Sequence, residues 1–316
     1  MADLEKNILV VIPVNEDHKK FLEEKAASGD KNCCIRYVNG EKVTKEDVEQ
    51  ADVIVGNVDP SLISGAKNLE LLQLNSAGAD LYIKAGVMPE GAVLANATGA
   101  YGLAVAEHML GLTFDLIRRL NQYHANQAEH VWKAMGNIIS VEGSTILVLG
   151  LGDIGGDYAR KVHALGAHVI GVRRTKRNKP DYLDEQHTMD DLDMLLGRAD
   201  IVAMVLPGGS ATNHIMDERS LRLMKKGAYL INVGRGNAID PDGLYKVLKD
   251  GHLGGCGLDV TEPEPLPADS PLWDLENLVI TPHVAGNFFL PETFERIVRI
   301  AGENLAAWAN GTPYRN

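Results

Sequence analysis

Three residues in the last third of the chain carry side chains that could do chemistry together: Arg235, Glu264 and His283. A guanidinium is a fixed cation whose fork matches a carboxylate, and an imidazole exchanges protons near neutral pH. A cation, a carboxylate and an imidazole are the parts needed to hold an anionic carbonyl compound and to exchange a proton with it. None of the three supports that hypothesis alone, so other elements must supply the second reactant.

A glycine-rich turn upstream indicates what that second reactant is. Residues 150–155 read Gly-Leu-Gly-Asp-Ile-Gly and stand between an apolar strand at 144–150 and an expected helix at Asp157–Leu165. The glycines permit a tight turn, close approach of the backbone to a pyrophosphate, and close helix packing. The helix N-terminus offers N–H groups and a positive dipole end to the phosphates. The pattern predicts a dinucleotide site and, with the three residues above, hydride transfer to a 2-keto acid.

The residues that follow the next strand indicate which dinucleotide binds. An NAD site usually carries an acid about 20 residues after the glycines, bonded to the ribose 2′-hydroxyl. Here Val172 is followed by Arg173, Arg174, Lys176 and Arg177, with no acid among them. Arginines bind a 2′-phosphate through charge-assisted bidentate hydrogen bonds, whereas a carboxylate would repel it. We therefore predict NADP(H) as the preferred cofactor, with NAD(H) as the alternative if the arginines form only a solvated basic loop.

The apolar pattern predicts an α/β fold with two doubly wound parallel sheets. Short apolar runs alternate with helical stretches, as in sheets that carry helices on their faces. A long apolar helix at Gly102–Leu120 separates the two runs, and a last helix at Pro291–Trp308 follows the second. The expected strands are Ile8–Ile12, Cys34–Val38, Val53–Val58, Leu69–Leu74 and Val93–Ala95, then 144–150, His168–Val172, Ile201–Leu206, Tyr229–Val233, Cys256–Val260 and Leu278–Ile280.

Composition limits the partners. The chain has 316 residues, enough for two domains, and its 45% hydrophobic and 23% charged residues are typical of a globular protein. A net charge of −12 argues against a nucleic-acid partner, and no apolar run approaches the roughly 20 residues of a membrane span. Cys33, Cys34 and Cys256 show no disulfide or metal spacing, and the N-terminus has no signal-peptide pattern. We expect a cytoplasmic protein with no metal and no membrane contact.

The ordered motifs resemble those of the D-2-hydroxyacid dehydrogenase family, and the resemblance covers essentially the whole chain. It implies a Rossmann cofactor domain at 101–284, inserted in a flavodoxin-like substrate domain made of 1–100 and 285–316. Within the family, the chain looks like an NADP-preferring reductase of glyoxylate, hydroxypyruvate or another 2-keto acid. The matching segments are 75–80, 96–99, 105–108, 150–155, 206–207, 232–236, 257–260, 264–265 and 281–283.

The resemblance also implies roles. Arg235 would bind the substrate carboxylate, and His283 would be the general acid in reduction and the general base in oxidation. Glu264 would pair with His283 and favour its imidazolium form. The substrate-binding set is completed by Ala77 and Gly78, whose N–H groups would cradle the carboxylate, and by Tyr101. Cofactor contacts are expected from Gly150, Gly152, Asp153, Ile154, Gly155, Arg173, Arg174, Leu206, Pro207, Thr212, Val233, Gly234, Asp259 (to the nicotinamide amide) and Gly286.

Two departures from family patterns narrow the range of possible substrates. Relatives that act on phosphorylated glycerate carry an arginine just before the substrate-loop glycines, and residues 72–76 contain none. Formate-oxidising relatives pair the histidine with an amide, whereas Glu264 favours reduction of a keto acid. We therefore expect a small unphosphorylated 2-keto acid as substrate and the D-2-hydroxy acid as product. The same chemistry fits several such acids, so the sequence does not name one.

Other interpretations stay open. A dinucleotide-sensing interaction protein, like the corepressors that share this fold and the three residues, is one alternative, and an NAD-preferring dehydrogenase of the family is another. The segment Asn121–Met135, with Tyr123, Val131 and Trp132, resembles the family's dimerisation arm, an extended segment that crosses to the partner. We therefore expect a homodimer; an ordinary surface helix is the alternative for this segment.

Overall fold

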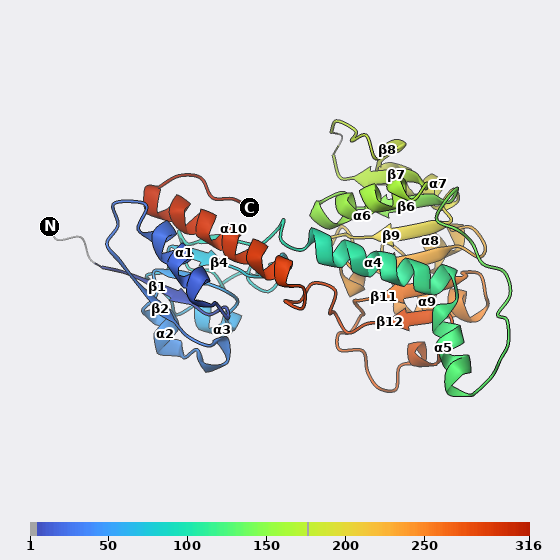
Figure 1. Ribbon diagram of the computed structural model, residues 1–316, viewed down its shortest axis with the longest axis horizontal. Helices are drawn as coiled ribbons and strands as arrows, with labels where there is room; N and C mark the ends of the chain where they lie inside the picture. The colour runs from blue at the N-terminus through green and yellow to red at the C-terminus, as the bar shows by residue number, and fades with distance from the viewer. Residues whose placement is uncertain (1–4, 176) are drawn as a thin grey trace. The chain divides into compact units, whose positions relative to one another are not determined.

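The computed structural model describes residues 5–175 and 177–316. The chain forms two compact units, each described here by itself (Figure 1). The first contains the chain up to Tyr101 together with Phe288–Asn316, and the second contains Gly102–Asn287. No helix among the described residues combines the length and apolar character needed to cross a membrane.

The first unit is built on a five-stranded sheet in which all strands are parallel. The strand order is β2-β1-β3-β4-β5, which is the order of flavodoxin-like folds. This order confirms the predicted fold class for this part of the chain. The strands are β1 (Lys6–Val10), β2 (Cys33–Tyr37), β3 (Val53–Val55), β4 (Leu71–Gln73) and β5 (Val93–Ala95).

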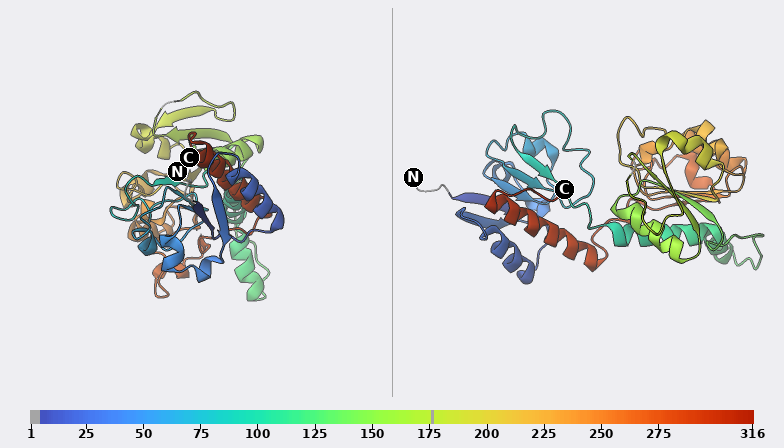
Figure 2. Two further views of the ribbon diagram at one scale, coloured as in Figure 1. Left: turned by 90° about the vertical axis from the view of Figure 1, so that its left-hand side faces the viewer. Right: turned by 90° about the horizontal axis from the view of Figure 1, so that it is seen from above.

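Helices cover both faces of this sheet. Helix α1 (Glu16–Ala26) packs against α10 (Pro291–Asn310), although the two stand at opposite ends of the sequence (Figures 1 and 2). Helices α2 (Lys45–Glu49) and α3 (Pro60–Ile63) contribute Val48 and Ile63 to a buried cluster with strand residues such as Ile54. A short 3-10 turn, η1, spans Gly40–Lys42.

The second unit is built on a seven-stranded parallel sheet in the order β12-β11-β10-β9-β6-β7-β8. Its first six strands in chain order follow the Rossmann arrangement 3-2-1-4-5-6, and β12 extends the sheet beyond the sixth. The predicted Rossmann fold is therefore confirmed. The strands are β6 (Thr145–Leu149), β7 (His168–Arg173), β8 (Glu185–Thr188), β9 (Ile201–Met204), β10 (Tyr229–Asn232), β11 (Gly255–Leu258) and β12 (Leu278–Ile280).

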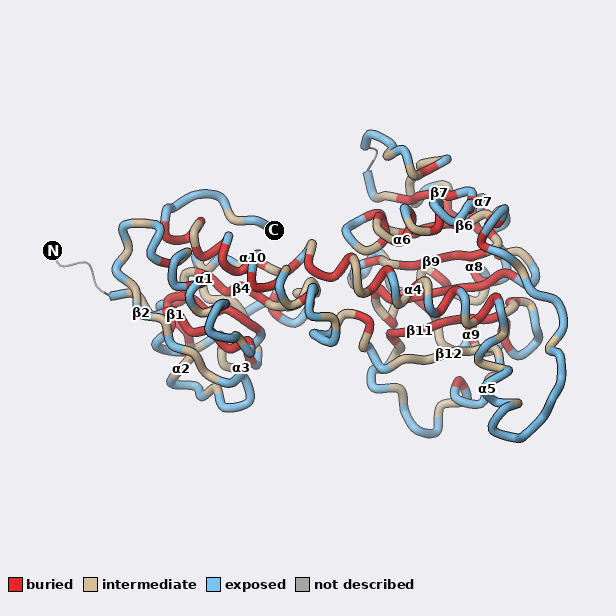
Figure 3. The backbone as a smooth tube through the Cα atoms, in the orientation of Figure 1, coloured by how far each residue is buried: buried red, intermediate tan, exposed pale blue. Residues whose placement is uncertain are grey.

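The residues of the central strands of this sheet are buried, as the red parts of the tube in Figure 3 show. Helices α4 (Gly102–Ile117) and α6 (Asp153–Ala164) pack together on one face. Helices α7 (Leu192–Leu196), α8 (Glu218–Leu223) and α9 (Pro241–Lys249) share a core cluster with the strands. The remaining elements are α5 (Leu120–Ala128) and the 3-10 turns η2 (Met189–Asp191), η3 (Gly236–Ala238) and η4 (Pro271–Asp274).

Several boundaries differ from those expected. Helix α6 begins at Asp153 rather than Asp157, because Gly152 is its N-cap and the glycine turn runs directly into the helix. Helix α4 ends at Ile117, since Arg119 adopts a left-handed conformation (φ 58°) that α-helices do not continue through. The arm segment, expected to be extended, begins with helix α5 and is irregular only after it.

Candidate active site

The predicted residues of the second unit lie where its parallel strands end. The glycine turn follows β6, Arg173 ends β7, and the loop from Leu206 follows β9. Arg235, Glu264 and His283 follow β10, β11 and β12, which are neighbours in the sheet. Doubly wound sheets bind ligands outside the carboxyl ends of their strands, where the strand order reverses. That point lies between β6 and β9 here, so both sets of residues share one edge of the sheet.

The glycine turn has the geometry that a dinucleotide requires. Gly150 has a φ of 97°, and a Cβ atom there would lie 2.6 Å from the carbonyl oxygen of Val205. A Cβ on Gly155 would lie 1.9 Å from the oxygen of Gly150, whereas one on Gly152 would meet no atom within 4 Å. Gly152 caps α6 without a side-chain hydrogen bond. The first and third glycines are therefore needed for packing, and the second leaves the helix N-terminus open to a phosphate.

Two predicted cofactor residues have partners within their own unit. The Asp153 carboxylate accepts the N–H of Gly102 at 2.7 Å, and the Thr212 hydroxyl donates to the carbonyl of Pro207 at 2.8 Å. Their contacts with a cofactor stay predictions. The other predicted residues around this edge are buried (Leu206, Val233 and Gly234), half-buried (Ile154 and Gly286) or exposed (Pro207).

The basic segment extends from the end of β7. Arg173 is half-buried, and its Nε is buried without a hydrogen-bond partner among the described residues. Arg174 is exposed, and Lys176 lies outside the described residues. A buried guanidinium nitrogen without an acceptor is unfavourable unless a ligand or water satisfies it. This geometry fits an anionic group next to β7. Among the described residues, no group of three or more His, Cys, Asp and Glu side chains is placed to hold a metal ion.

Arg235 is held by its neighbours in the turn after β10. The side chain of Asn232, fully buried, accepts the Gly234 N–H at 3.0 Å and donates to the Arg235 carbonyl at 2.9 Å. A Cβ on Gly234 would lie 2.5 Å from the Leu206 oxygen, and one on Gly236 would lie 1.9 Å from the oxygen of Thr261. The glycines on both sides of Arg235 therefore let its turn pack closely against the loops after β9 and β11.

The structure brings His283 and Glu264 together. The Nδ1 atom of His283 lies 2.5 Å from Oε1 of Glu264, and the two side chains are 49% and 41% exposed. His283 has a φ of 52°, a left-handed conformation that histidine adopts more readily than most residues. Its own N–H donates to the Asp259 carbonyl at 2.8 Å. Because Nδ1 is engaged by the carboxylate, Nε2 is the nitrogen left for proton exchange.

The carboxylate of Asp259 organises the turn that carries His283. This residue is 2% exposed, and its Oδ1 accepts the Thr281 hydroxyl at 2.6 Å and the Val284 N–H at 3.0 Å. Its Oδ2 accepts the Ala285 N–H at 3.1 Å. His108, on α4, reaches the Thr281 hydroxyl through Nε2 at 3.0 Å. Asp259 therefore positions the His283 turn, a role not expected from the sequence, while its contact with the nicotinamide stays a prediction.

The predicted carboxylate cradle of the first unit is a loop held by side-chain hydrogen bonds. Asn57 and Asn75 exchange hydrogen bonds: each side-chain oxygen accepts the other residue's N–H, at 3.0 and 2.6 Å. The Asn57 amide donates to the Ser76 hydroxyl at 3.1 Å, which donates to the Gly78 carbonyl at 2.7 Å. Within the described chain, the N–H groups of Ala77 and Gly78 have no acceptor. Two neighbouring N–H groups of this kind suit an anion.

Tyr101 supports this loop. Its side chain is buried, and its hydroxyl donates to the Asn75 carbonyl. Burial raises the pKa of the Tyr101 hydroxyl above its usual range, so it stays protonated and keeps donating. Its expected contact with the substrate stays a prediction, because this hydroxyl proton is already used within the first unit.

Three polar residues important to these arrangements had no role in the sequence-based prediction. Asn232 and Thr281 each stand at or just after the end of a strand, inside motifs recognised for other reasons. A polar side chain at the carboxyl end of an apolar strand was the signal that could have singled them out. Asn57 belongs to no motif, and only the fold shows that it meets Asn75.

The fold and this edge define a nicotinamide-dinucleotide oxidoreductase. Residues 110–285 match the family described as D-isomer specific 2-hydroxyacid dehydrogenase, NAD binding domain. The chain belongs to the D-isomer specific 2-hydroxyacid dehydrogenase family, and it is an enzyme of that family.

Relatives extend the similarity to both units. Glyoxylate/hydroxypyruvate reductase B of Erwinia tasmaniensis is 31% identical over 315 residues, which cover 95% of this chain and 96% of the relative. A solved family member from Aeromonas salmonicida is 30% identical with a TM-score of 0.84, covering 98% of this chain and 97% of its own. A 2-hydroxyacid dehydrogenase from Xanthobacter autotrophicus, solved with NADPH and MES, is 26% identical with a TM-score of 0.80, covering 99% and 98%.

Proposed function

We propose that this enzyme uses NADPH to reduce a small unphosphorylated 2-keto acid to the D-2-hydroxy acid. The observation that carries the proposal is the His283–Glu264 pair at 2.5 Å. The two residues follow β12 and β11, and β11 is the neighbour of β10, the strand that ends at the Arg235 turn. The similarity to a glyoxylate/hydroxypyruvate reductase makes glyoxylate and hydroxypyruvate the first substrates to test.

Each residue has one task in the proposed reaction. When bound, the nicotinamide cofactor supplies a hydride to the keto carbon. Arg235 binds the substrate carboxylate through its guanidinium fork. His283 donates a proton from Nε2 to the keto oxygen, since Nδ1 lies against Glu264. Glu264 orients the ring and stabilises its charged form, so the carbonyl gains a hydride and a proton and becomes a hydroxyl.

The preference for NADPH rests on the end of β7. Arg173 and Arg174 stand where an NAD site usually has an acid, and the buried Nε of Arg173 has no acceptor among the described residues. A 2′-phosphate would supply one. The relative solved with NADPH supports the same choice. An enzyme that prefers NADH is the alternative.

We assign the two units different tasks. The second unit would be the cofactor domain, close to the predicted range 101–284, and the first would be the substrate domain. Within the first unit, the N–H groups of Ala77 and Gly78, which have no acceptor within the described chain, would be donors to the substrate carboxylate.

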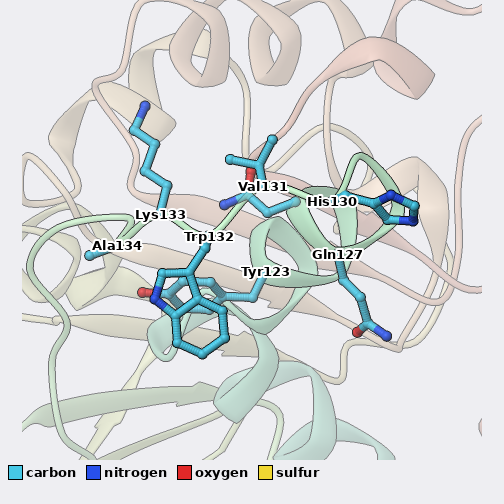
Figure 4. A pocket seen from close by; sticks show the side chains of 8 residues that line it. Tyr123, Gln127, His130, Val131, Trp132, Lys133 and Ala134 are labelled. Carbon is cyan, nitrogen blue, oxygen red and sulfur yellow. The ribbon is translucent and has the colours of Figure 1, made fainter.

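We also propose a homodimer. Helix α5 and the segment after it expose several large apolar side chains, and Trp132 is fully exposed. Three of them, Tyr123, Val131 and Trp132, help to line a hollow of about 640 Å³ on this segment (Figure 4). Exposed apolar patches of this kind mark interaction surfaces, and the arm resembles the dimerisation segment of the family. The apolar residues involved are Leu120, Tyr123, Val131, Trp132 and Ile138.

A kinetic survey tests the proposed reaction. The purified protein would be assayed with glyoxylate, hydroxypyruvate, pyruvate and branched or aromatic 2-keto acids, each with NADPH and NADH. We expect kcat/KM above about 10⁴ M⁻¹s⁻¹ for at least one acid, in the normal range of enzymes, and a lower value with NADH. The His283→Ala and Arg235→Ala variants should lose turnover. Tight NADPH binding without turnover of any acid would refute the proposal and favour a dinucleotide-sensing protein.

A further inference from the structure

The stretch Glu262-Pro-Glu264-Pro carries two glutamates, and each of them meets its own histidine. Glu264 pairs with His283, and Oε2 of Glu262 lies 2.7 Å from Nε2 of His214. The side chains of this second pair are 41% and 39% exposed, much like the first. We propose that His214 and Glu262 are positioning residues that hold Glu264 against His283. This inference rests on the proposed function.

His214 is fixed by the segment that follows Arg235. Its N–H donates to the Asn237 carbonyl at 2.8 Å, and the N–H of Met216 donates to the Ala238 carbonyl at 3.0 Å. Asn237 and Ala238 belong to η3, which begins directly after Arg235. The histidine side chain therefore extends from a segment tied to the Arg235 turn towards the loop that carries Glu264.

The loop on the other side has few ties of its own. Val260 is buried. Thr261 packs closely against Gly236, since a Cβ atom on Gly236 would lie 1.9 Å from the Thr261 oxygen. Beyond Thr261, residues 262–266 are exposed or half-buried. Within the described chain, two hydrogen bonds tie residues 262–266 to more distant segments: Glu262 to His214 and Glu264 to His283.

We call the Glu262–His214 pair the brace, because it helps to hold Glu264 in its pair with His283. If the Glu262–His214 bond is lost, the hydrogen bond to His283 must hold the loop tip alone. Glu264 then spends less time in the orientation that supports the charged imidazole. Exposed ion pairs add little to global stability. Loss of the Glu262–His214 bond should therefore slow proton transfer and leave the Tm nearly unchanged.

Three variants test the brace. Glu262→Ala removes the bond, and His214→Asn removes it while keeping a residue that tolerates the left-handed backbone at His214 (φ 46°). Glu262→Gln keeps an acceptor for His214 without the charge. Misplacing a catalytic group by about 1 Å can cost on the order of 10²-fold in rate, so we expect kcat to fall about tenfold in the first two variants. KM for the keto acid and the Tm should change little, and Glu262→Gln should retain most of the activity.

The pH dependence separates this role from a merely structural one. Reduction needs a protonated His283, so weaker support from Glu264 should move the basic limb of the pH profile of kcat/KM to lower pH in Glu262→Ala. The His283 imidazole titration, followed by NMR, should move the same way without any turnover, so it tests the brace even if the proposed reaction is wrong. Glu295→Ala, which breaks the 2.9 Å His18–Glu295 pair of the first unit, is the matched control and should change neither.

Three results would overturn the inference. One is an unmoved His283 titration in both Glu262→Ala and His214→Asn. Another is a lowered kcat with an unchanged pH profile, which would place the effect elsewhere. The third is an equal loss in Glu262→Gln and Glu262→Ala, since a retained hydrogen bond should then have preserved the position of Glu264.

Discussion

Replacing Asp259 by asparagine should weaken both the fold of the second unit and its chemistry. The carboxylate is buried and accepts the Thr281 hydroxyl and the Val284 N–H at Oδ1 and the Ala285 N–H at Oδ2. Asparagine has nearly the same shape but offers one oxygen and one amino group. If the asparagine oxygen takes the place of Oδ1, the asparagine amino group faces the Ala285 N–H. Two donors then face each other at a buried position without an acceptor.

The size of the effect follows from these three contacts. A buried donor left without an acceptor costs about 1–3 kcal/mol. The two bonds to the remaining oxygen become neutral and lose about half of their strength, or about 1 kcal/mol together. The free energy of unfolding of the second unit should therefore fall by about 2–4 kcal/mol. For a unit of this size each kcal/mol lowers Tm by ~2–4 °C, which predicts a decrease of at least about 4 °C.

Calorimetry and kinetics of Asp259→Asn check this reasoning, and Thr281→Val is its matched control. Valine has nearly the same shape as threonine but lacks the hydroxyl. The free energy of unfolding of Thr281→Val should therefore fall by about 1–2 kcal/mol, less than that of Asp259→Asn. The kcat of Asp259→Asn should fall on the order of tenfold or more, because the turn carrying His283 shifts. A Tm within 1 °C of the wild type, or a larger loss in Thr281→Val, would refute the assignment of Asp259 as the organising acceptor.

Three further variants address other parts of the molecule. Arg173→Asp should raise KM for NADPH about 10- to 100-fold through loss of a charge-assisted bond while NADH use is kept or improved; equal effects on both cofactors would contradict the assignment. Tyr101→Phe should raise KM for the keto acid about 2- to 10-fold, as expected for loss of one hydrogen bond to the Asn75 loop; an unchanged KM would exclude the supporting role. Trp132→Glu should convert a dimer into a 34.3 kDa monomer in light scattering, and a variant that remains dimeric would show that the arm is not the interface.

The sequence predicted both sheets because burial leaves a simple pattern in parallel strands. Every residue of β9 and β10 is buried, so β9 reads as a continuous apolar run and β10 as one up to its last residue, Asn232. The glycine turn also has a local signature. The cap of α9 was also local: the Asp240 side chain accepts the N–H groups of Asp242 and Gly243, with Pro241 in the first turn. Such features depend on residues close in sequence and can be predicted from it.

Other features depend on contacts between distant residues. The edge strand β8 reads Glu-Gln-His-Thr and is half-buried throughout, so it has no apolar run to reveal it. The bonds of Asn57 with Asn75, and of Asp259 with Thr281, join strand ends that only the fold brings together. Neither arrangement has a spacing that a sequence pattern could show. The partners of a catalytic residue are therefore harder to predict than the residue itself.

Two acids that follow the same strand show why this distinction matters. Asp259 comes directly after β11 and is 2% exposed with three donors around its carboxylate, whereas Glu264, five residues later, is 41% exposed at its side chain with one imidazole partner. A buried acceptor contributes to stability because no water can take its place as the partner of its donors. An exposed ion pair contributes little. Glu264→Gln should therefore lower kcat with nearly unchanged Tm, whereas Asp259→Asn lowers both. Within one loop, the buried acid therefore holds the turn in place, and the exposed acid is the one proposed to take part in the chemistry.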